Sequence, residues 1–342
     1  MDGDPQTPEA QVLAFLAEGG DDYTSGEALS GKLGLSRAAV WKYVEGLRAR
    51  GYRIDAVPAR GYRLVEIPDR LSALELFPLL GTRELGQTLH HFEELPSTNQ
   101  TAFALAGQGA AHGEVVIAEA QTAGRGRRGR SWITLPGKGL SLSVILRPQL
   151  PPQRAPELTL VAAVALAEAL TDAGAAAGIK WPNDVQLEGR KVAGILTEMS
   201  AEPDQVHFVV LGIGVNLNGS AQDFPEELRG QLTSLAAERG SAVPRALFTA
   251  ALLARLESWL DRHESEGFEV VREAWKARST TLGAQVMVRA EGRVTEGRAV
   301  DIDEGGALLL RLEDGSVTRI LAGDVEHLRP ASAAGEMRPQ GL

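Results

Sequence analysis

The sequence predicts a multidomain α+β protein built from three parts: a winged helix-turn-helix (residues 1–66), an α+β domain (67–276) and a small β-barrel (277–330). Three observations lead to this prediction. The first part reads as three helices followed by a hairpin, and the second alternates β-branched segments with long helical ones. The third holds five short strands separated by glycines. The tail, 331–342, is expected to be disordered.

Length and composition indicate a globular protein with substantial cores. The 342 residues are 44% hydrophobic and 23% charged, which is ordinary for such proteins. The sequence has no cysteine, and this excludes disulfides, thiolate metal sites and a cysteine nucleophile. The N-terminus lacks the order of a signal peptide, and the most apolar run, 158–170, is too short to span a membrane. We therefore expect a cytoplasmic protein without a membrane partner.

The N-terminal part has the element order of a winged helix-turn-helix. Apolar residues at helical spacing mark the first two helices, and Gly34 closes the second. Ser36 can cap the third helix, and a strand–turn–strand pattern with its tip at 58–61 follows. The predicted elements are helices over 9–19, 25–35 and 36–51 and a hairpin over 52–65.

Charge supports a DNA-binding role for this part. Residues 24–63 hold eight Lys or Arg and three acids, a net charge of 8 − 3 = +5 inside a chain whose formal charge is −10. Such a local excess is the electrostatic footprint expected for contact with DNA phosphates. The alternative is a small dimerisation or regulatory domain whose charges are merely solvated. The candidate DNA-binding residues are Ser36, Arg37, Lys42, Arg48 and Arg60.

The middle part is predicted to form a mostly antiparallel or mixed sheet with helices on one face. It contains neither G-x-G-x-x-G opening a helix nor G-x-x-x-x-G-K-[ST]. The strand-like segments are 113–120, 140–148, 192–200 and 206–217, and the helix-like segments are 155–174 and 245–265. In the third part, glycine turns are expected at Gly292, Gly297, Gly305–Gly306 and Gly315.

The segment "QTAGRGRRGRSW", 121–132, concentrates four arginines and three glycines. Arginine pairs bidentately with phosphate and carboxylate, and glycines let the backbone approach a ligand. A solvated loop or an RNA-binding arm would use the same residues. The segment lies between an apolar strand and Trp132, which favours a loop folded over a pocket for a phosphate-bearing small molecule.

Three further clusters carry polar groups. In "KWPNDVQLEGRKVAGIL", 180–196, "WPND" is a turn whose Asn183 and Asp184 could hold a nucleotide or a Mg²⁺-bound water, and Lys191 is either a surface lysine or a charge aimed at a phosphate or carboxylate. In "LPSTNQTA", 95–102, the consecutive Ser, Thr and Asn could cap a helix or read an amide or ureido group. The fourth cluster is "GIGVNLN", a strand that ends in polar residues.

In this order, "STN", "QTAGRGRRGRSW", "KWPNDV…GRKVAGIL" and "GIGVNLN" resemble the biotin protein ligases. The resemblance spans residues 8–330, and the winged helix makes the chain similar to the bifunctional bacterial form, a ligase that is also the biotin operon repressor. It implies a class-II-synthetase-like catalytic domain and an SH3-like C-terminal barrel. The implied substrates are biotin and ATP, with Mg²⁺. The implied partners are a biotin carboxyl carrier protein, operator DNA of biotin genes, and a second copy of the chain when adenylate is bound.

The resemblance also implies two-step chemistry and a set of site residues. Biotin carboxylate attacks the α-phosphate of ATP to give biotinyl-5′-AMP and pyrophosphate, and a carrier lysine then attacks the mixed anhydride. Lys191 and Arg127 match catalytic positions. Positions that match biotin contacts are Ser97, Thr98, Asn99, Gln121, Arg125, Gly126, Arg127 and Lys191. Positions that match ATP or adenylate contacts are Arg125, Arg127, Arg128, Trp132, Lys180, Asn183, Asp184 and Asn216.

Three alternatives stay open from sequence. The chain could be a ligase of the same superfamily that acts on lipoate or octanoate, although the glycine–arginine loop and the winged helix argue against it. It could be a biotin-binding DNA sensor without catalysis, which the presence of both Lys191 and the arginine loop disfavours. It could also be a ligase whose winged helix no longer binds an operator, and the sequence does not separate this case from the bifunctional one.

Overall fold

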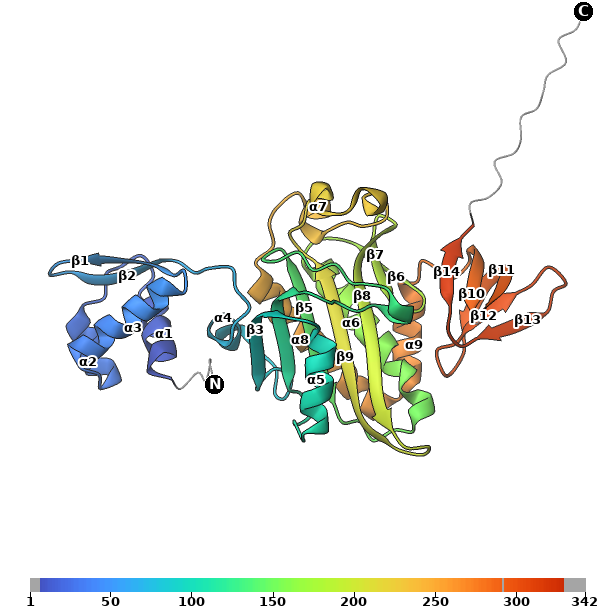
Figure 1. Ribbon diagram of the computed structural model, residues 1–342, viewed down its shortest axis with the longest axis horizontal. Helices are drawn as coiled ribbons and strands as arrows, with labels where there is room; N and C mark the ends of the chain where they lie inside the picture. Colours follow the sequence, from blue (N-terminus) through green and yellow to red (C-terminus); the bar gives the residue numbers. More distant parts are fainter. Residues whose placement is uncertain (1–6, 291, 329–342) are drawn as a thin grey trace, which may run out of the picture.

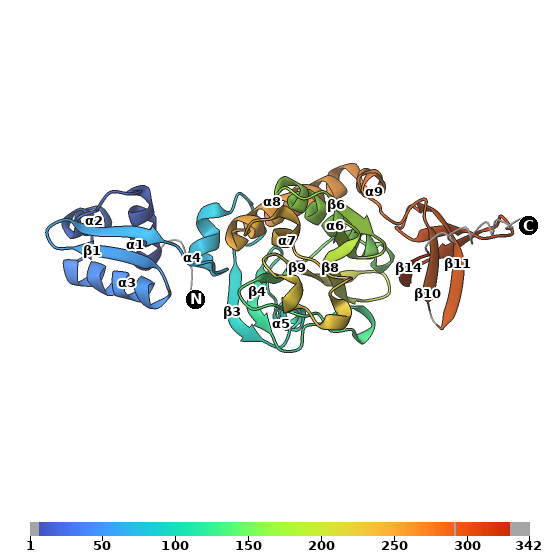
Figure 2. The same ribbon diagram turned by 90° about the horizontal axis from the view of Figure 1, so that it is seen from above.

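The computed structural model describes residues 7–290 and 292–328. They form three parts that follow one another along the longest axis of the molecule, with the largest sheet in the middle (Figures 1 and 2). Within these residues, no helix has both the length and the apolar character that crossing a membrane requires. The tail predicted to be disordered lies outside the described residues.

The winged helix-turn-helix prediction is confirmed. Its elements are α1 (Pro8–Glu18), α2 (Gly26–Leu33), α3 (Arg37–Ala49), β1 (Arg53–Val57) and β2 (Gly61–Glu66). The Ser36 hydroxyl accepts a hydrogen bond from the N–H of Ala39 (3.1 Å) and so caps α3, and Gly34 ends α2 in the left-handed conformation. Val40, Val44 and Leu47, which lie at helical spacing along α3, are buried.

The central domain is built on a seven-stranded mixed sheet of order β3-β4-β5-β9-β8-β7-β6. Only the β3–β4 pair is parallel among these neighbours. The strands are β3 (Leu89–Leu95), β4 (Val115–Gln121), β5 (Gly139–Leu146), β6 (Ala177–Lys180), β7 (Asp184–Leu187), β8 (Arg190–Ala201) and β9 (Val206–Asn216). The sequence analysis missed β3, which is rich in polar residues, and the two four-residue strands β6 and β7.

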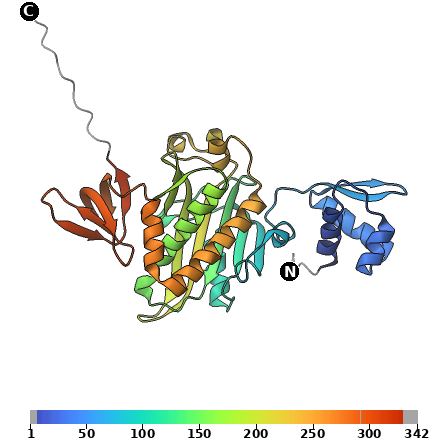
Figure 3. The same ribbon diagram turned by 180° about the vertical axis from the view of Figure 1, so that it is seen from behind.

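Helices cover both faces of this sheet, so the expectation of helices on one face is wrong. The helices α6 (Pro156–Asp172), α8 (Arg245–Glu266) and α9 (Phe268–Ala277) lie on one face (Figure 3), and α5 (Thr98–Gly107) lies on the other (Figure 1). The reason is that β4 is apolar on both sides. Val115 and Ile117 join the core under α6 and α8, while Val116 and Ala118 pack with Ala102 of α5.

The C-terminal part is a five-stranded antiparallel sheet of order β13-β12-β11-β10-β14. Its strands are β10 (Gln285–Ala290), β11 (Arg293–Ile302), β12 (Leu308–Arg311), β13 (Val317–Ile320) and β14 (Asp324–His327). The number of strands was predicted correctly, but Gly297 lies inside β11 rather than in a turn. In the described part of the chain, β13 and β14 do not pair with each other, so hydrogen bonds do not close the barrel.

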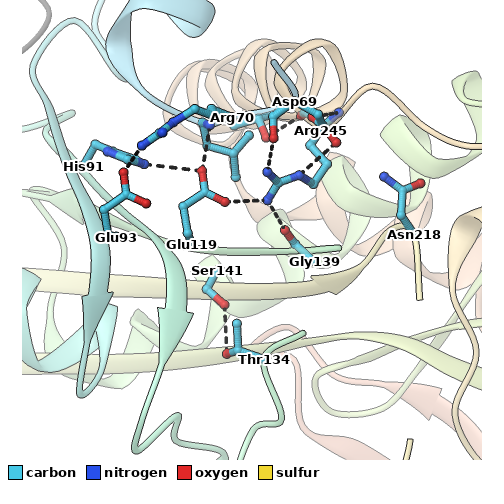
Figure 4. Close-up of polar contacts among 12 residues, drawn as sticks. Asp69, Arg70, His91, Glu93, Glu119, Thr134, Gly139, Ser141, Asn218 and Arg245 are labelled. Atoms are coloured by element: carbon cyan, nitrogen blue, oxygen red, sulfur yellow. Dashed lines mark hydrogen bonds and ion pairs between the residues drawn. The ribbon is translucent and has the colours of Figure 1, made fainter. Parts of the chain in front are cut away.

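The segment between the winged helix and the central domain is anchored by Arg245, the first residue of α8, whose side chain is 1% exposed. Its guanidinium donates to the Asp69 carboxylate (3.1 Å), to Glu119 Oε2 on β4 (2.8 Å) and to the main-chain oxygen of Gly139 on β5 (3.1 Å). Glu119 Oε1 accepts from the N–H of Leu71 at 2.9 Å. Figure 4 shows this cluster beside Thr134 and Ser141. A buried arginine therefore joins the linker to two strands of the central sheet.

This cluster predicts an acid-sensitive contribution to stability. Burial would raise the pKa of Glu119, but the hydrogen bond from His91 and the charge and hydrogen bond of Arg245 lower it to about 2, from 4.5. The ionised carboxylate therefore stabilises the fold above pH 4.5, and the contribution is lost as the pH falls towards 2. We expect Glu119→Gln to lower the free energy of unfolding at pH 7 by about 3 kcal/mol.

Urea unfolding at pH 7 and pH 3 checks this, because the deficit of the variant should shrink at the lower pH. A deficit of the same size at both pH values would contradict the assignment.

Candidate active site

A cavity in the central domain collects residues from all four sequence clusters. It opens beside the sheet where β4, β5, β8 and β9 are neighbours, and β14 of the C-terminal sheet reaches its rim through Asp324. Every predicted ligand-site residue lines it except Arg128 and Asn216. The predicted residues that line it are Ser97, Thr98, Asn99, Gln121, Arg125, Gly126, Arg127, Trp132, Lys180, Asn183, Asp184 and Lys191.

Glycines form the floor of the cavity. A Cβ at Gly212 of β9 would overlap the side-chain amide of Asn99, and one at Gly214 would overlap the indole ring of Trp132. Since residues i and i+2 of a strand point to the same face, these two glycines leave that face of β9 open for the two side chains. In "GIGVNLN", the two glycines therefore shape the cavity more than the polar end does. Their spacing of two residues within a strand could have indicated this from the sequence.

A polar cluster forms one wall of the cavity. Gln121 Oε1 accepts from the N–H of Thr98 (2.7 Å), and Gln121 Nε2 donates to Thr134 Oγ1 (3.2 Å) and Ser141 Oγ (3.3 Å). The hydroxyl of Ser143, which is fully buried, lies 2.6 Å from Asn99 Oδ1 and 2.9 Å from Thr98 Oγ1. The amide of Gln121 is therefore held in one orientation by its neighbours.

Ser97 differs from its neighbours because its hydroxyl remains available. It occupies the N-cap position of α5, yet its side chain makes no capping hydrogen bond, so the expectation of a simple cap is wrong for this residue. The side chain is 2% exposed and lines the cavity. A nearly buried hydroxyl in this position can hydrogen-bond a ligand inside the cavity.

The arginine segment folds back on itself as a hairpin at the cavity entrance. The N–H of Gly126 donates to the oxygen of Arg130 (2.7 Å), and the N–H of Trp132 donates to the oxygen of Gly124 (2.8 Å). A Cβ at Gly124 would overlap the main-chain oxygen of Trp132, so this crossing requires glycine. The prediction of a loop folded over a pocket is confirmed.

Two arginines of this hairpin point into the cavity. Arg125 Nη1 lies 3.3 Å from Glu198 Oε1 on β8, and Arg127 Nη1 donates to Asn183 Oδ1 at 3.1 Å. Burial lowers the pKa of Arg127, because the surrounding protein replaces water around its charge. Asn183 in turn donates to the main-chain oxygen of Ile195 (2.7 Å), so the "WPND" turn supports Arg127.

Two lysines complete the positive side of the cavity. Lys191 Nζ lies 2.6 Å from Asp184 Oδ1 and 5.8 Å from the centre of the Trp132 ring. Burial lowers the pKa of Lys180, and the charge of Lys191 lowers it further. The two ammonium groups thus share one small region and would each gain from an anion placed between them.

The two predicted residues that do not line the cavity have other contacts. Arg128 donates to the main-chain oxygen of Arg289 (2.9 Å) and lies 3.5 Å from Asp324, which also pairs with Arg130 at 2.5 Å. Asn216 is 4% exposed and donates to the main-chain oxygen of Thr233 (3.1 Å). Arg128 therefore ties the hairpin to the C-terminal sheet, and Asn216 ties β9 to the segment before α7 (Leu235–Arg239).

Sequence reasoning missed several residues of this site. Asp324 comes from the C-terminal sheet, and no local pattern around it pointed to a ligand site. Ser141 and Ser143 alternate with leucines in "LSLSV", and serines facing one side of an apolar strand were a usable signal. Glu198 lies in β8, seven residues beyond Lys191.

The surface of the winged helix presents most of the predicted DNA-binding residues. Ser36, Arg37, Lys42 and Arg60 are exposed, and the Arg60 guanidinium lies 4.3 Å from the ring centre of Tyr23. Arg48 differs, because its Nε donates to the main-chain oxygen of Ile54 (3.0 Å) and its Nη1 pairs with Glu45 at 2.7 Å. Arg48 therefore fastens α3 to the wing.

Fold and site together define a class: an α+β domain with a cationic, hydrogen-bonding cavity, fused to a winged helix. Comparison with known proteins agrees with this. The models of the biotin/lipoate A/B protein ligase family, the HTH domain and the biotin protein ligase C-terminal domain match residues 92–216, 9–63 and 281–328.

Relatives match nearly the whole chain. It is 39% identical to the bifunctional ligase/repressor BirA of Bacillus subtilis over 94% of this chain and 98% of that one, and 33% identical to the Escherichia coli protein of the same name over 93% and 97%. Biotin protein ligase from Aquifex aeolicus in complex with biotin and ATP superposes with a TM-score of 0.62 at 28% identity, over 71% of this chain and 100% of that one. The chain belongs to the biotin protein ligase family, among its bifunctional ligase/repressors.

Proposed function

We propose that this chain forms biotinyl-5′-AMP from biotin and ATP in the cavity, transfers the biotinyl group to a lysine of a biotin carboxyl carrier protein, and represses transcription in response to biotin. The names of its relatives support both activities. The observation that carries the ligase proposal is the cavity, where a hydrogen-bonding wall faces a set of four positive side chains. These are Arg125, Arg127, Lys180 and Lys191.

The polar wall suits the ring of biotin. A ureido group offers two N–H donors and one carbonyl acceptor, and each must find a partner when it is buried. Ser97 supplies a hydroxyl without a capping partner, and Thr98 and Gln121, which contact each other, line the cavity beside it. The lipoyl ring has no such groups, so a lipoate in this cavity would leave the nearly buried Ser97 hydroxyl without a partner, at about 1–3 kcal/mol.

The positive side chains suit the reacting end. In the first step a biotin carboxylate oxygen attacks the α-phosphorus of ATP, and pyrophosphate leaves with the bonding electron pair. Lys191 and Arg127 lie where they can bring the two anions together and stabilise the charge that develops on phosphorus. In the second step the carrier lysine amine attacks the carbonyl carbon and AMP leaves, while the arginine hairpin keeps water from the mixed anhydride.

Magnesium enters the proposal through ATP. No group of three or more His, Asp or Glu side chains that could hold a metal is found in the described residues. Mg²⁺ usually binds nucleotide phosphates with one or two carboxylates and keeps several waters. Asp184, which lines the cavity, is the side chain that would contact a Mg²⁺ carried in by ATP. The metal would supply charge neutralisation on the phosphates.

Biotin-dependent release of pyrophosphate tests the ligase proposal. Purified chain, ATP and Mg²⁺ should release pyrophosphate when biotin is added, and biotin should then appear on a carrier domain but not on one whose acceptor lysine is replaced by arginine. Octanoate and lipoate at equal concentration should neither replace biotin nor compete with it. Release with octanoate in place of biotin would favour the lipoate-type alternative.

Arg127 is expected to retain the adenylate. Arg127→Gly should accelerate loss of biotinyl-AMP by about tenfold, as expected for removing one charged hydrogen bond, and should increase labelling of bystander proteins. The matched variant is Arg293→Gly, which removes the same charge from an exposed side chain at the start of β11, outside the cavity. Equal labelling by both variants would contradict a specific role for Arg127.

The repressor part of the proposal rests on the winged helix. Its exposed basic residues would contact operator DNA, and a dimer would place two winged helices on two half-sites. Adenylate in the cavity would favour that dimer, because an ordered arginine hairpin can complete an interface that a mobile one cannot. The test of DNA binding is described in the Discussion.

A further inference from the structure

We propose that Glu198 is a positioning residue that holds Asn99 in one orientation and keeps the arginine hairpin in its closed placement. The inference rests on the proposed ligase function and assigns a residue that neither the sequence clusters nor the cavity lining include. Glu198 lies on β8, the strand that also carries Lys191. Its side chain is 26% exposed and reaches towards α5 and the hairpin.

The two oxygens of this carboxylate serve two different segments. Oε2 accepts a hydrogen bond from Asn99 Nδ2 at the start of α5 (2.9 Å). Oε1 lies 3.3 Å from Nη1 of Arg125, at the beginning of the hairpin. One side chain thus joins the Ser-Thr-Asn cluster to the arginine segment, although Asn99 and Arg125 lie 99 and 73 residues before Glu198 in the chain.

The contact with Asn99 fixes the direction of a chain of hydrogen bonds. Nδ2 of Asn99 donates to the main-chain oxygen of Leu196 (3.1 Å) as well as to Glu198, so both of its protons are used. Its Oδ1 must then face Ser143, whose hydroxyl donates to it. Because the Ser143 hydroxyl proton is used in this bond, the Thr98 hydroxyl donates either to Ser143 Oγ or to Gln121 Oε1.

The Gln121 amide is oriented separately, because the main-chain N–H of Thr98 donates to its oxygen. Gln121 keeps its oxygen towards Thr98 and its Nε2 towards Thr134 and Ser141. Asn99, 4% exposed and with all its polar atoms occupied, has no free donor for a ligand. Asn99 therefore acts through its neighbours rather than by touching biotin, which revises the role that the resemblance implied for it.

The contact with Arg125 anchors one end of the hairpin. At the other end, Asp324 holds Arg130. Without Glu198, Arg125 would lose the carboxylate with which it pairs. The end of the hairpin nearer β4 would then be held by main-chain contacts alone. The hairpin would then open more often, and an open hairpin releases the adenylate.

Two substitutions separate the two roles of the carboxylate. Glu198→Gln keeps an oxygen that can accept from Asn99 but removes the charge that faces Arg125. We expect the KM for biotin to stay close to the wild-type value and the loss of biotinyl-AMP to accelerate about threefold, as for the loss of one partly exposed ion pair. Glu198→Ala removes both contacts, and we expect it to raise the KM for biotin about tenfold in addition.

The experiment forms labelled adenylate on the full-length protein from biotin, ATP and Mg²⁺, adds excess unlabelled biotin without carrier protein, and follows the label that stays on the protein. The matched control is Glu168→Gln. It neutralises a carboxylate that also contacts arginine, Arg278 (2.9 Å) and Arg255 (3.8 Å), and a neutral N–H, on Trp259 (2.9 Å), outside the cavity. The control should release adenylate at the wild-type rate.

A double substitution gives an independent check. If Glu198 acts through Arg125, then Glu198→Gln combined with Arg125→Gln should release adenylate no faster than Arg125→Gln alone. Additive effects would overturn the anchoring role, and so would a Glu198→Gln variant that retains adenylate as long as the wild type or longer. Failure of the proposed function would look different, since the wild-type protein would then form no adenylate at all.

Discussion

Replacing Lys191 with alanine should lower the rate of biotin-dependent pyrophosphate release by about 10²–10³-fold, the loss typical for one charge positioned at a developing anion. Lys191, the second residue of β8, holds its Nζ 2.6 Å from Asp184 and above the Trp132 ring. Its removal deletes a positive charge and also leaves the Asp184 carboxylate to repel the incoming phosphate.

Two variants make this prediction specific. Lys191→Arg should retain part of the rate that Lys191→Ala loses, because it keeps a positive charge facing Asp184. The matched control is Lys138→Ala, which breaks another lysine–aspartate pair of similar geometry, Lys138 Nζ to Asp223 Oδ1 at 2.7 Å, outside the cavity lining. A Lys191→Ala protein with near-normal turnover would remove this lysine from the mechanism.

DNA binding should depend steeply on salt and on the exposed basic residues of α3. Each neutralised phosphate contributes roughly −0.9 to the slope of log affinity against log salt. Replacing Arg37 and Lys42 together with alanine should therefore flatten the slope by about 2 for one bound copy and by about 4 for a dimer on two half-sites. Mobility shifts on the DNA upstream of biotin genes in the source genome, at several salt concentrations, measure this slope.

The same assay tests whether the ligand controls DNA binding. Biotin with ATP should raise the affinity of the wild-type protein, and the Arg37 and Lys42 variant should retain full ligase activity because neither residue lines the cavity. The charge-matched control replaces Arg255, which is exposed, and Arg262, which is partly exposed, both on α8, and should leave the slope unchanged. Equal DNA affinity with and without biotin and ATP would contradict a corepressor role for the adenylate.

Deleting the winged helix tests ligase activity and DNA binding separately. The contacts that anchor the linker to the central domain lie beyond residue 66. A chain that begins after Glu66 keeps Asp69 and Leu71, and with them the contacts to Arg245 and Glu119. It should retain some ligase activity and lose operator binding. This expectation follows from the position of the cavity, which contains no residue of the winged helix.

The sequence by itself determined the features that depend on local chemistry. Ser36 and Gly34 marked the ends of helices because a hydroxyl that accepts a backbone N–H and a residue that tolerates positive φ act within one helical turn. The arginine hairpin and the "WPND" turn were predictable for the same reason, since glycine, proline and asparagine fix the backbone over a few residues.

Only the tertiary structure decided which polar groups meet and which stay free. The strand order β5-β9-β8 places Glu198 beside Asn99, and the C-terminal sheet brings Asp324 to the hairpin. These contacts depend on long-range pairing, which no local pattern encodes. Ser97 has a free hydroxyl and Asn99 has a fully occupied amide, although the two residues lie two positions apart in the same motif. They differ because hydrogen bonding in a buried site depends on every neighbour in space, and the sequence names only the neighbours along the chain.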